Sequence, residues 1–219
     1  MKIKAFLLTI VVIFSVMCSI SCTKDREYDE QEVLSAAEVL IKRSENLNEI
    51  YYGYGIDYIE DMNTSIGDFY EADYDSLKRY GVFCIEDIKL LTRECFTNDL
   101  SNIIINTKLS SVSDEDGIQE LARYSEKTLD GETILLVYKN ADVYLTDKVV
   151  YDYSSLYVSD VEGEEVFVNV TVTVTNKDGD TQTKELKIAL LEESDGWRLN
   201  SPTYTKYVDR SYYDDLQNK

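Results

Sequence analysis

The side chains that could do chemistry in this chain are acids and tyrosines, because the sequence contains no histidine. That absence excludes Ser-His-Asp and Cys-His nucleophilic sites, zinc sites that need histidine, and histidine general bases. Paired carboxylates remain, and Asp57 with Glu60 or Asp61 could share one helix face. Neighbouring acids are expected by chance in a chain with 42 acidic residues, so we expect neither catalysis nor a cofactor.

Acids and aromatic residues alternate over residues 56–80. Seven acids precede the first base of this segment, and we name them the acidic rim: Asp57, Glu60, Asp61, Asp68, Glu71, Asp73 and Asp75. Tyrosine presents contact area with little rotamer entropy to lose, so the rim could capture a cation, a sugar or a basic peptide. The simpler interpretation is that the aromatic rings cover the edge of the core while the acids face water.

The bulk charge restricts the possible partners. With 42 acidic against 22 basic residues, the formal net charge is −20. Such a surface repels nucleic acid and anionic lipid headgroups. Solubility is the simplest role for this charge, and cationic partners, Ca²⁺ included, are the alternative.

One window is similar to a calcium-binding loop. Asn176, Asp178, Gly179 and Glu185 have the spacing of EF-hand ligands, but Val174 stands at the first ligand position. The window also lies between two strand-like runs, whereas an EF-hand loop joins helices. We expect no calcium site there.

The cysteines of the folded part are Cys84 and Cys95. On one helix they would be about 16 Å apart, too far for a disulfide. They have no C-x-x-C spacing, so a metal or redox site is disfavoured and small buried hydrophobes are expected.

The N-terminus has the layout of a secretory signal: a basic start, an apolar run over residues 5–17, then Ser19-Ile20-Ser21-Cys22. These four residues resemble a bacterial lipobox, so we expect cleavage before Cys22 and a diacylglycerol on its thiol. Cys18 is a poorer candidate, because Met17 would occupy the small-residue position. The alternatives are an uncleaved anchor, since residues 5–23 approach the roughly 20 residues that span a bilayer, and ordinary secretion. All three place the folded part outside the cytoplasm.

Helical periodicity dominates the first half of the chain. Apolar residues recur at three and four positions over residues 32–52 and predict an amphipathic helix that Gly53 and Gly55 end. Cys84 opens a second helix in capping-box style, and Thr97 opens a third. Residues 56–80 predict a short helix and a loop.

Strand periodicity dominates the second half. Valines alternate with other residues over 166–174, turn residues follow at 176–180, and alternation returns at 186–190, which predicts an antiparallel hairpin. Residues 197–202 predict a third strand that Pro202 ends, with Trp197 filling the core. Further strand-like runs are residues 121–124, 134–138 and 149–157.

Three pieces carry a family resemblance: FCIEDI at residues 83–88 leading to CFT at 95–97, LARY at 121–124, and GWRLNSPTY at 196–204. They resemble extracellular lipoproteins of low-GC Gram-positive bacteria with a nuclear transport factor 2-like, or cystatin-like, roll. The resemblance implies an α+β fold in which N-terminal helices pack on one curved antiparallel sheet.

The leader, the acid-rich segment after it and the resemblance together predict a division of the chain, and the resemblance also implies a site. Residues 1–22 would be the signal peptide, 23–31 an acidic tether, 32–208 one roll domain and 209–219 a polar tail. The cavity of such a roll lies between the first helix and the concave sheet face, so Tyr51 and Tyr54, near the helix end, are candidate lining residues.

These expectations combine into a lipid-anchored binding module on the extracellular face of the cell membrane. It would be non-enzymatic and would hold a small molecule or a protein segment in the cavity. The alternative is a protein-protein regulator, such as an inhibitor of cell-wall hydrolases, that presents the acidic rim to a basic enzyme surface. Nucleic acid is not an expected partner in either case.

Overall fold

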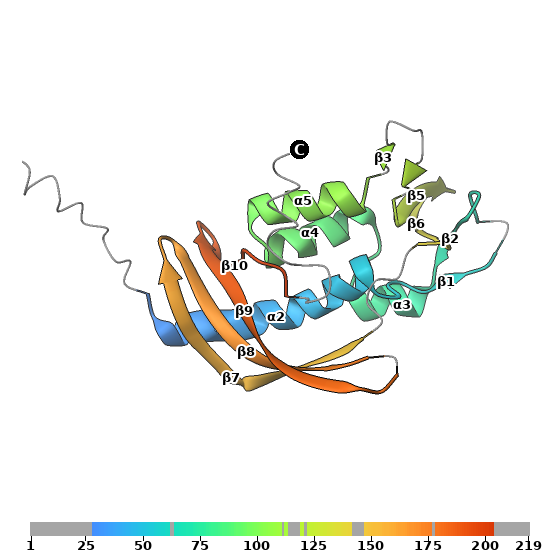
Figure 1. Ribbon diagram of the computed structural model, residues 1–219. Helices are drawn as coiled ribbons and strands as arrows, with labels where there is room; N and C mark the ends of the chain where they lie inside the picture. Colours follow the sequence, from blue (N-terminus) through green and yellow to red (C-terminus); the bar gives the residue numbers. More distant parts are fainter. Residues whose placement is uncertain are drawn as a thin grey trace, which may run out of the picture.

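The computed structural model describes residues 28–61, 64–110, 112–113, 119–120, 122–141, 147–176 and 178–203. The expected signal peptide with Cys22, most of the tether and the polar tail lie outside these residues. Helices come first in the chain and long strands last, which confirms the α+β class (Figure 1).

The long helix α2 (Glu30–Tyr52) begins where its capping chemistry starts. The carboxylate of Asp29 accepts hydrogen bonds from the backbone N–H groups of Gln31 and Glu32, at 2.9 and 3.3 Å. Glu30 and Glu32 in the first turn also complement the helix dipole. The predicted helix over residues 32–52 is confirmed, with one more half-turn at its start.

Two residues from a distant segment cap the C-terminal end of α2. The helix has no basic residue in its last turn. Instead, the guanidinium of Arg123 donates to the carbonyls of Gly53 and Tyr51, and the hydroxyl of Tyr124 donates to the carbonyl of Ile50 at 2.7 Å. Both side chains are buried. The LARY run of the sequence therefore satisfies carbonyls that a helix end leaves unpaired.

The larger sheet has the strand order β10-β9-β8-β7 and is antiparallel throughout. Its strands are β7 (Lys148–Glu162), β8 (Glu165–Thr175), β9 (Thr181–Glu193) and β10 (Gly196–Leu199). This confirms the predicted hairpin and the existence of the third strand, which ends at Leu199 and not at Pro202. In the β8–β9 turn the Asn176 side-chain oxygen accepts from the N–H groups of Asp178 and Asp180, so the window with calcium-loop spacing is a hairpin turn.

The core lies between α2 and the larger sheet. In Figure 1, α2 runs along one face of this sheet, with α4 (Ile85–Cys95) and α5 (Asn98–Lys108) on the other side of the helix. Val168, Val170 and Leu190 of the sheet are fully buried. Trp197 is 8% exposed and belongs to the same core, as predicted from its place after a turn.

A smaller antiparallel sheet has the order β1-β2-β6-β5. Its strands are β1 (Tyr58–Ile59), β2 (Phe69–Ala72), β5 (Tyr124–Leu129) and β6 (Glu132–Tyr138), and α3 (Tyr74–Tyr80) follows β2. A separate pair joins β3 (Val112–Ser113) and β4 (Gln119–Glu120). The expected single curved sheet is therefore wrong, because the strands form two open four-stranded sheets.

The expectation for residues 56–80 is also wrong in part. The segment contains β1 and β2 as well as a short helix. Pairing with a distant strand explains the difference: Phe69 lies opposite Tyr138 and Glu71 opposite Leu136 in β6. Such a non-local partner leaves no periodic signal in a strand of two or four residues.

The helix α4 starts as its sequence predicts. The carboxylate of Asp87 accepts from the N–H groups of Phe83 and Cys84, at 2.8 and 3.1 Å. Cys84 therefore lies half-buried at the helix start, whereas Cys95 lies in the core with its thiol 3.4 Å from the carbonyl of Leu40. Both thiols are free. The role of small buried hydrophobe is confirmed for Cys95, and Cys84 instead has a place at the helix terminus.

The two thiols should differ in reactivity. Burial raises the pKa of Cys95 to about 12 and raises that of Cys84 less. Only the thiolate reacts with iodoacetamide, so at about pH 8 we expect Cys84 to be alkylated first and Cys95 only after unfolding. Peptide mass spectrometry with and without denaturant measures both rates. Equal rates in the folded protein would contradict the packing described for Cys95.

A pair of glycines tests the closure of α2. Both Gly55 and Gly67 have positive φ, at 70° and 58°. A Cβ on Gly55 would lie 2.7 Å from the Tyr124 hydroxyl, whereas a Cβ on Gly67 would meet nothing within 4 Å. In both alanine variants the side chain is strained by the positive φ, so this cost is the same in the two. Gly55→Ala should therefore lower the free energy of unfolding by ~1–3 kcal/mol more than Gly67→Ala does, which is the usual cost of overpacking. Urea denaturation measures the difference, and equal losses would show that the close approach is unimportant.

Candidate functional site

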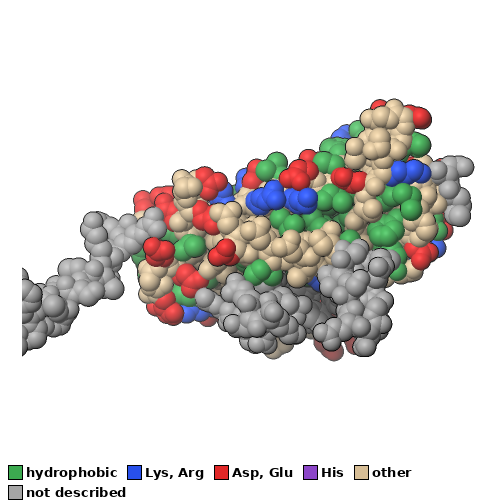
Figure 2. Space-filling model, turned by 90° about the horizontal axis from the view of Figure 1, so that it is seen from above, with side chains coloured by type: hydrophobic (Ala, Val, Ile, Leu, Met, Phe, Trp, Pro, Cys, Tyr) green, Lys and Arg blue, Asp and Glu red, His purple; other side chains and the backbone are tan. Residues whose placement is uncertain are grey.

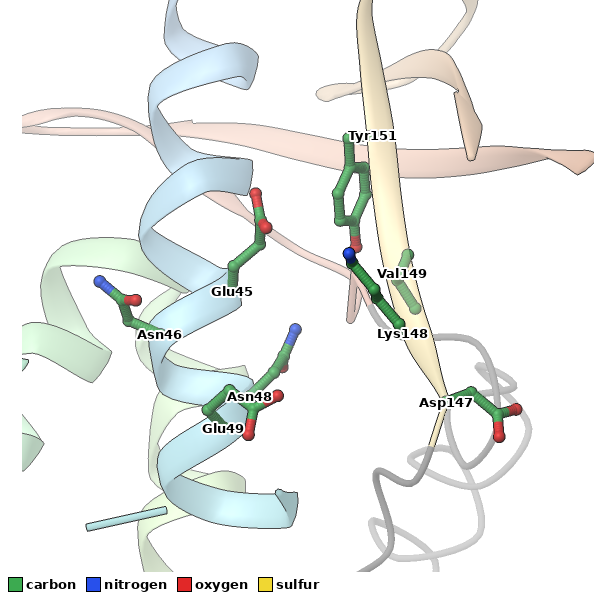
Figure 3. Close-up of a pocket in the computed structure, with 8 residues that line it drawn as sticks. All are labelled: Glu45, Asn46, Asn48, Glu49, Asp147, Lys148, Val149 and Tyr151. Carbon is green, nitrogen blue, oxygen red and sulfur yellow. The ribbon is translucent and has the colours of Figure 1, made fainter. Parts of the chain in front are cut away.

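A pocket of about 240 Å³ lies between the second half of α2 and the start of β7 (Figure 3). Its wall is polar except for Val149 and the ring of Tyr151. The lining residues are Glu45, Asn46, Asn48, Glu49, Asp147, Lys148, Val149 and Tyr151. Because residues three and four apart are neighbours on a helix, Glu45, Asn48 and Glu49 share the face of α2 that borders the strand.

The two walls of the pocket differ in charge. In Figure 3, Glu45, Asn48 and Glu49 extend from α2 toward the gap, and Lys148 extends toward it from β7. Asn46 and Asp147 project away from the gap in this view. Carboxylates therefore lie on the helix side of the gap and an ammonium lies on the strand side.

Thr203 joins the two walls. Its hydroxyl is 2.7 Å from the hydroxyl of Ser44 and accepts from the amide of Asn48 at 3.0 Å. Its carbonyl accepts from the hydroxyl of Tyr151 at 2.7 Å. Thr203 is 1% exposed, so these bonds are shielded from water. The segment after β10 thus fixes the separation of α2 and β7.

Tyr153 fixes the carboxylate of Glu45. The phenol of Tyr153 donates a hydrogen bond to Oε1 of Glu45, its ring stacks on that of Tyr151, and the ammonium of Lys42 lies 4.6 Å from its ring centre. Burial, together with the negative charge of Glu45, raises the pKa of Tyr153. The phenol therefore stays protonated and remains a donor at neutral pH.

The second carboxylate of the helix wall belongs to Glu49. Partial burial raises its pKa, whereas a hydrogen bond from the backbone of Tyr54 and the positive charge of Arg123 lower it. A carboxylate that has lost part of its hydration gains more from a cationic partner than a fully hydrated one does. This wall is therefore suited to a positively charged group.

The two tyrosines proposed from sequence do not line this pocket. Tyr51 is 2% exposed, and its hydroxyl bonds that of Thr92 at 2.6 Å on the side of α4. Tyr54 follows the helix and is 75% exposed. The pocket lies toward the same end of the helix but on another face. The polar residues Ser44, Glu45 and Asn48, which interrupt the apolar stripe, were the available signal.

The acidic rim lies around β1, β2 and α3, and bases accompany part of it. Asp57 lies 3.8 Å from Arg79, and Glu60 lies 3.0 Å from Lys139. Asp73 caps α3 by accepting from the N–H of Ser76 at 2.9 Å.

The remaining rim residues lie in a helix, in a strand and in turns. Asp75 lies in the first turn of α3, Glu71 lies within β2, and the backbone carbonyl of Asp68 accepts from the N–H of Lys139. The backbone carbonyl of Asp61 accepts from Thr64 and Ser65. The ion pairs of Asp57 and Glu60 and the capping role of Asp73 make the rim a mixed surface with several structural acids. Mixed charge is not confined to the rim, because Figure 2 shows basic side chains beside acidic ones across the face seen from above.

Within the described part of the chain, no group of three or more cysteine, aspartate or glutamate side chains could hold a metal ion. No helix there is long and apolar enough to cross a membrane. The residues expected to form the leader, Cys22 included, lie outside that part.

Comparison with models of protein families, with curated proteins and with solved structures gave no match to this chain. The resemblance to roll lipoproteins therefore stays a prediction. The geometry of the pocket between α2 and β7 carries the functional argument.

Proposed function

We propose that this chain is a non-catalytic binding module, held at the outer face of the cell membrane by a lipid on Cys22. It holds a small polar molecule between α2 and the larger sheet. In this proposal the helix and that sheet correspond to the helix and sheet of a cystatin-like roll. The observation that carries the proposal is the pocket between α2 and β7, which is where the roll resemblance implies a cavity.

The form of the pocket supports a small ligand over a protein segment. Pockets for drug-sized molecules measure roughly 300–1,000 Å³, and this one is smaller, at about 240 Å³. Its walls are fixed before binding, because Thr203 bonds both of them and Tyr153 holds Glu45. Such preorganisation lowers the entropy that a small ligand must overcome.

A surface feature favours the second candidate, a regulator of a cell-wall hydrolase. Tyr74 and Phe83 are 65% and 46% exposed, and their rings lie 6.2 Å apart beside Asp73 and Asp75. Exposed aromatic anchors next to acids are suited to a basic protein surface. The association rate of such a complex would fall steeply as salt rises.

The mass of the native protein tests the binding proposal. The full chain is purified in mild detergent from its own membrane, and its mass is measured under native and then denaturing conditions. We expect a discrete mass increment that denaturation releases, because a ligand would occupy the preformed pocket. Equal native and denatured masses would contradict small-molecule carriage and favour the hydrolase regulator.

Two cysteine variants test the lipid anchor. Cys22→Ala should abolish incorporation of labelled fatty acid, and it should release the chain to the medium or leave an unprocessed precursor. Cys18→Ala is the matched control and should be labelled normally. Normal labelling of the Cys22→Ala chain would exclude attachment at that residue.

A further inference from the structure

We infer that the pocket between α2 and β7 selects small zwitterions, molecules of amino-acid or dipeptide size that carry one ammonium and one carboxylate. This inference rests on the proposed function, since it names the class of ligand that the same pocket would hold. It follows from the opposite charges of the two walls.

The ammonium of Lys148 is available to a ligand. Four other lysines, Lys42, Lys89, Lys139 and Lys187, each lie within 4.0 Å of a carboxylate. Lys148 forms no ion pair with any residue that the structure describes, although it lines a pocket with acids on the opposite wall. A lysine ammonium is a compact charge with three donors, suited to a ligand carboxylate.

The helix wall offers the complementary charge in a fixed position. The bond from Tyr153 uses Oε1 of Glu45, and a carboxylate can accept several hydrogen bonds at once. Glu49 lies one turn further along the same face of α2. An ammonium group placed between these two carboxylates would be attracted by both.

A ligand with only one charge satisfies half of this site. A cation would be attracted by the helix wall but would face the like charge of Lys148, and an anion would be attracted by Lys148 but would face two carboxylates. A ligand that carries both charges meets a complementary charge on each wall. Val149 and the ring of Tyr151 supply apolar contact for the carbon skeleton between the two charges.

Three matched probes test the charge requirement on the full chain in mild detergent. Glycylglycine carries both charges, glycylglycinamide only the ammonium, and N-acetylglycylglycine only the carboxylate. We expect isothermal titration calorimetry to show that glycylglycine binds at least about tenfold more tightly than either of the others. Comparable binding by glycylglycinamide would overturn the inference and would indicate a site for cations.

Variants of the two walls locate the binding. Lys148→Gln should weaken glycylglycine at least about tenfold and should not weaken glycylglycinamide. Glu45→Gln keeps an oxygen acceptor for Tyr153 but removes the charge, so it should weaken both of these probes. Lys127→Gln in β5 and Glu94→Gln in α4 are the charge-matched controls outside the pocket and should change neither. An unaltered affinity for glycylglycine in Lys148→Gln, with an unaltered melting temperature, would overturn the inference.

The two proposals fail in different ways. If the native mass shows a releasable increment but glycylglycine does not bind, the inference on zwitterions is overturned while the binding module stands. If no increment is found and none of the three probes binds, both are overturned.

Discussion

Arg123 and Tyr124 satisfy the last carbonyls of α2, and the rest of the structure depends on this closure. The helix packs on the larger sheet on one side and on α4 on the other, so its end must be fixed for both contacts to persist. Tyr124 is also the first residue of β5, and the N–H of Tyr138 in β6 bonds the carbonyl of Arg123. The same two residues therefore attach the smaller sheet to the end of the helix. Removing a buried donor here would leave a carbonyl unsatisfied, at a cost of about 1–3 kcal/mol.

The pocket depends on a second connection, which Thr203 makes between α2 and β7. The pocket lies beside Glu45 and Asn48, whose polar side chains flank the apolar stripe that continues through Leu47 and Ile50. Thr203 connects the helix and the strand there by bonding Ser44, Asn48 and Tyr151. A site between a helix and a sheet is thereby held open with its polar groups in place. Such fixed geometry is what a small ligand requires, since it can contribute few contacts of its own.

The larger sheet and α2 could be predicted from sequence, because each element is long and strongly periodic. The valines of β8 and the stripe that contains Val33 and Ala37 are examples. The smaller sheet could be predicted only in part. The strand-like run at 134–138 is most of β6, whereas β1 and β2 have two and four residues and depend on a partner far along the chain. The pocket was missed for the same reason. Helical periodicity gives the face on which Glu45 lies, but nothing local pairs that face with Lys148, about a hundred residues later.

The net charge of the protein favours cationic ligands, whereas the charges that line the pocket favour a ligand with both signs of charge. A net charge of −20 lowers the local concentration of anions and raises that of cations around the molecule. This field alone would favour cationic ligands at any surface cleft. Lys148 alters the balance at one place, because it sets a positive charge on the wall opposite Glu45 and Glu49. A ligand with no net charge is not repelled by the field at a distance, and a ligand with two opposite charges satisfies the site on contact. Selectivity for zwitterions thus follows from one lysine placed in an otherwise acidic surrounding.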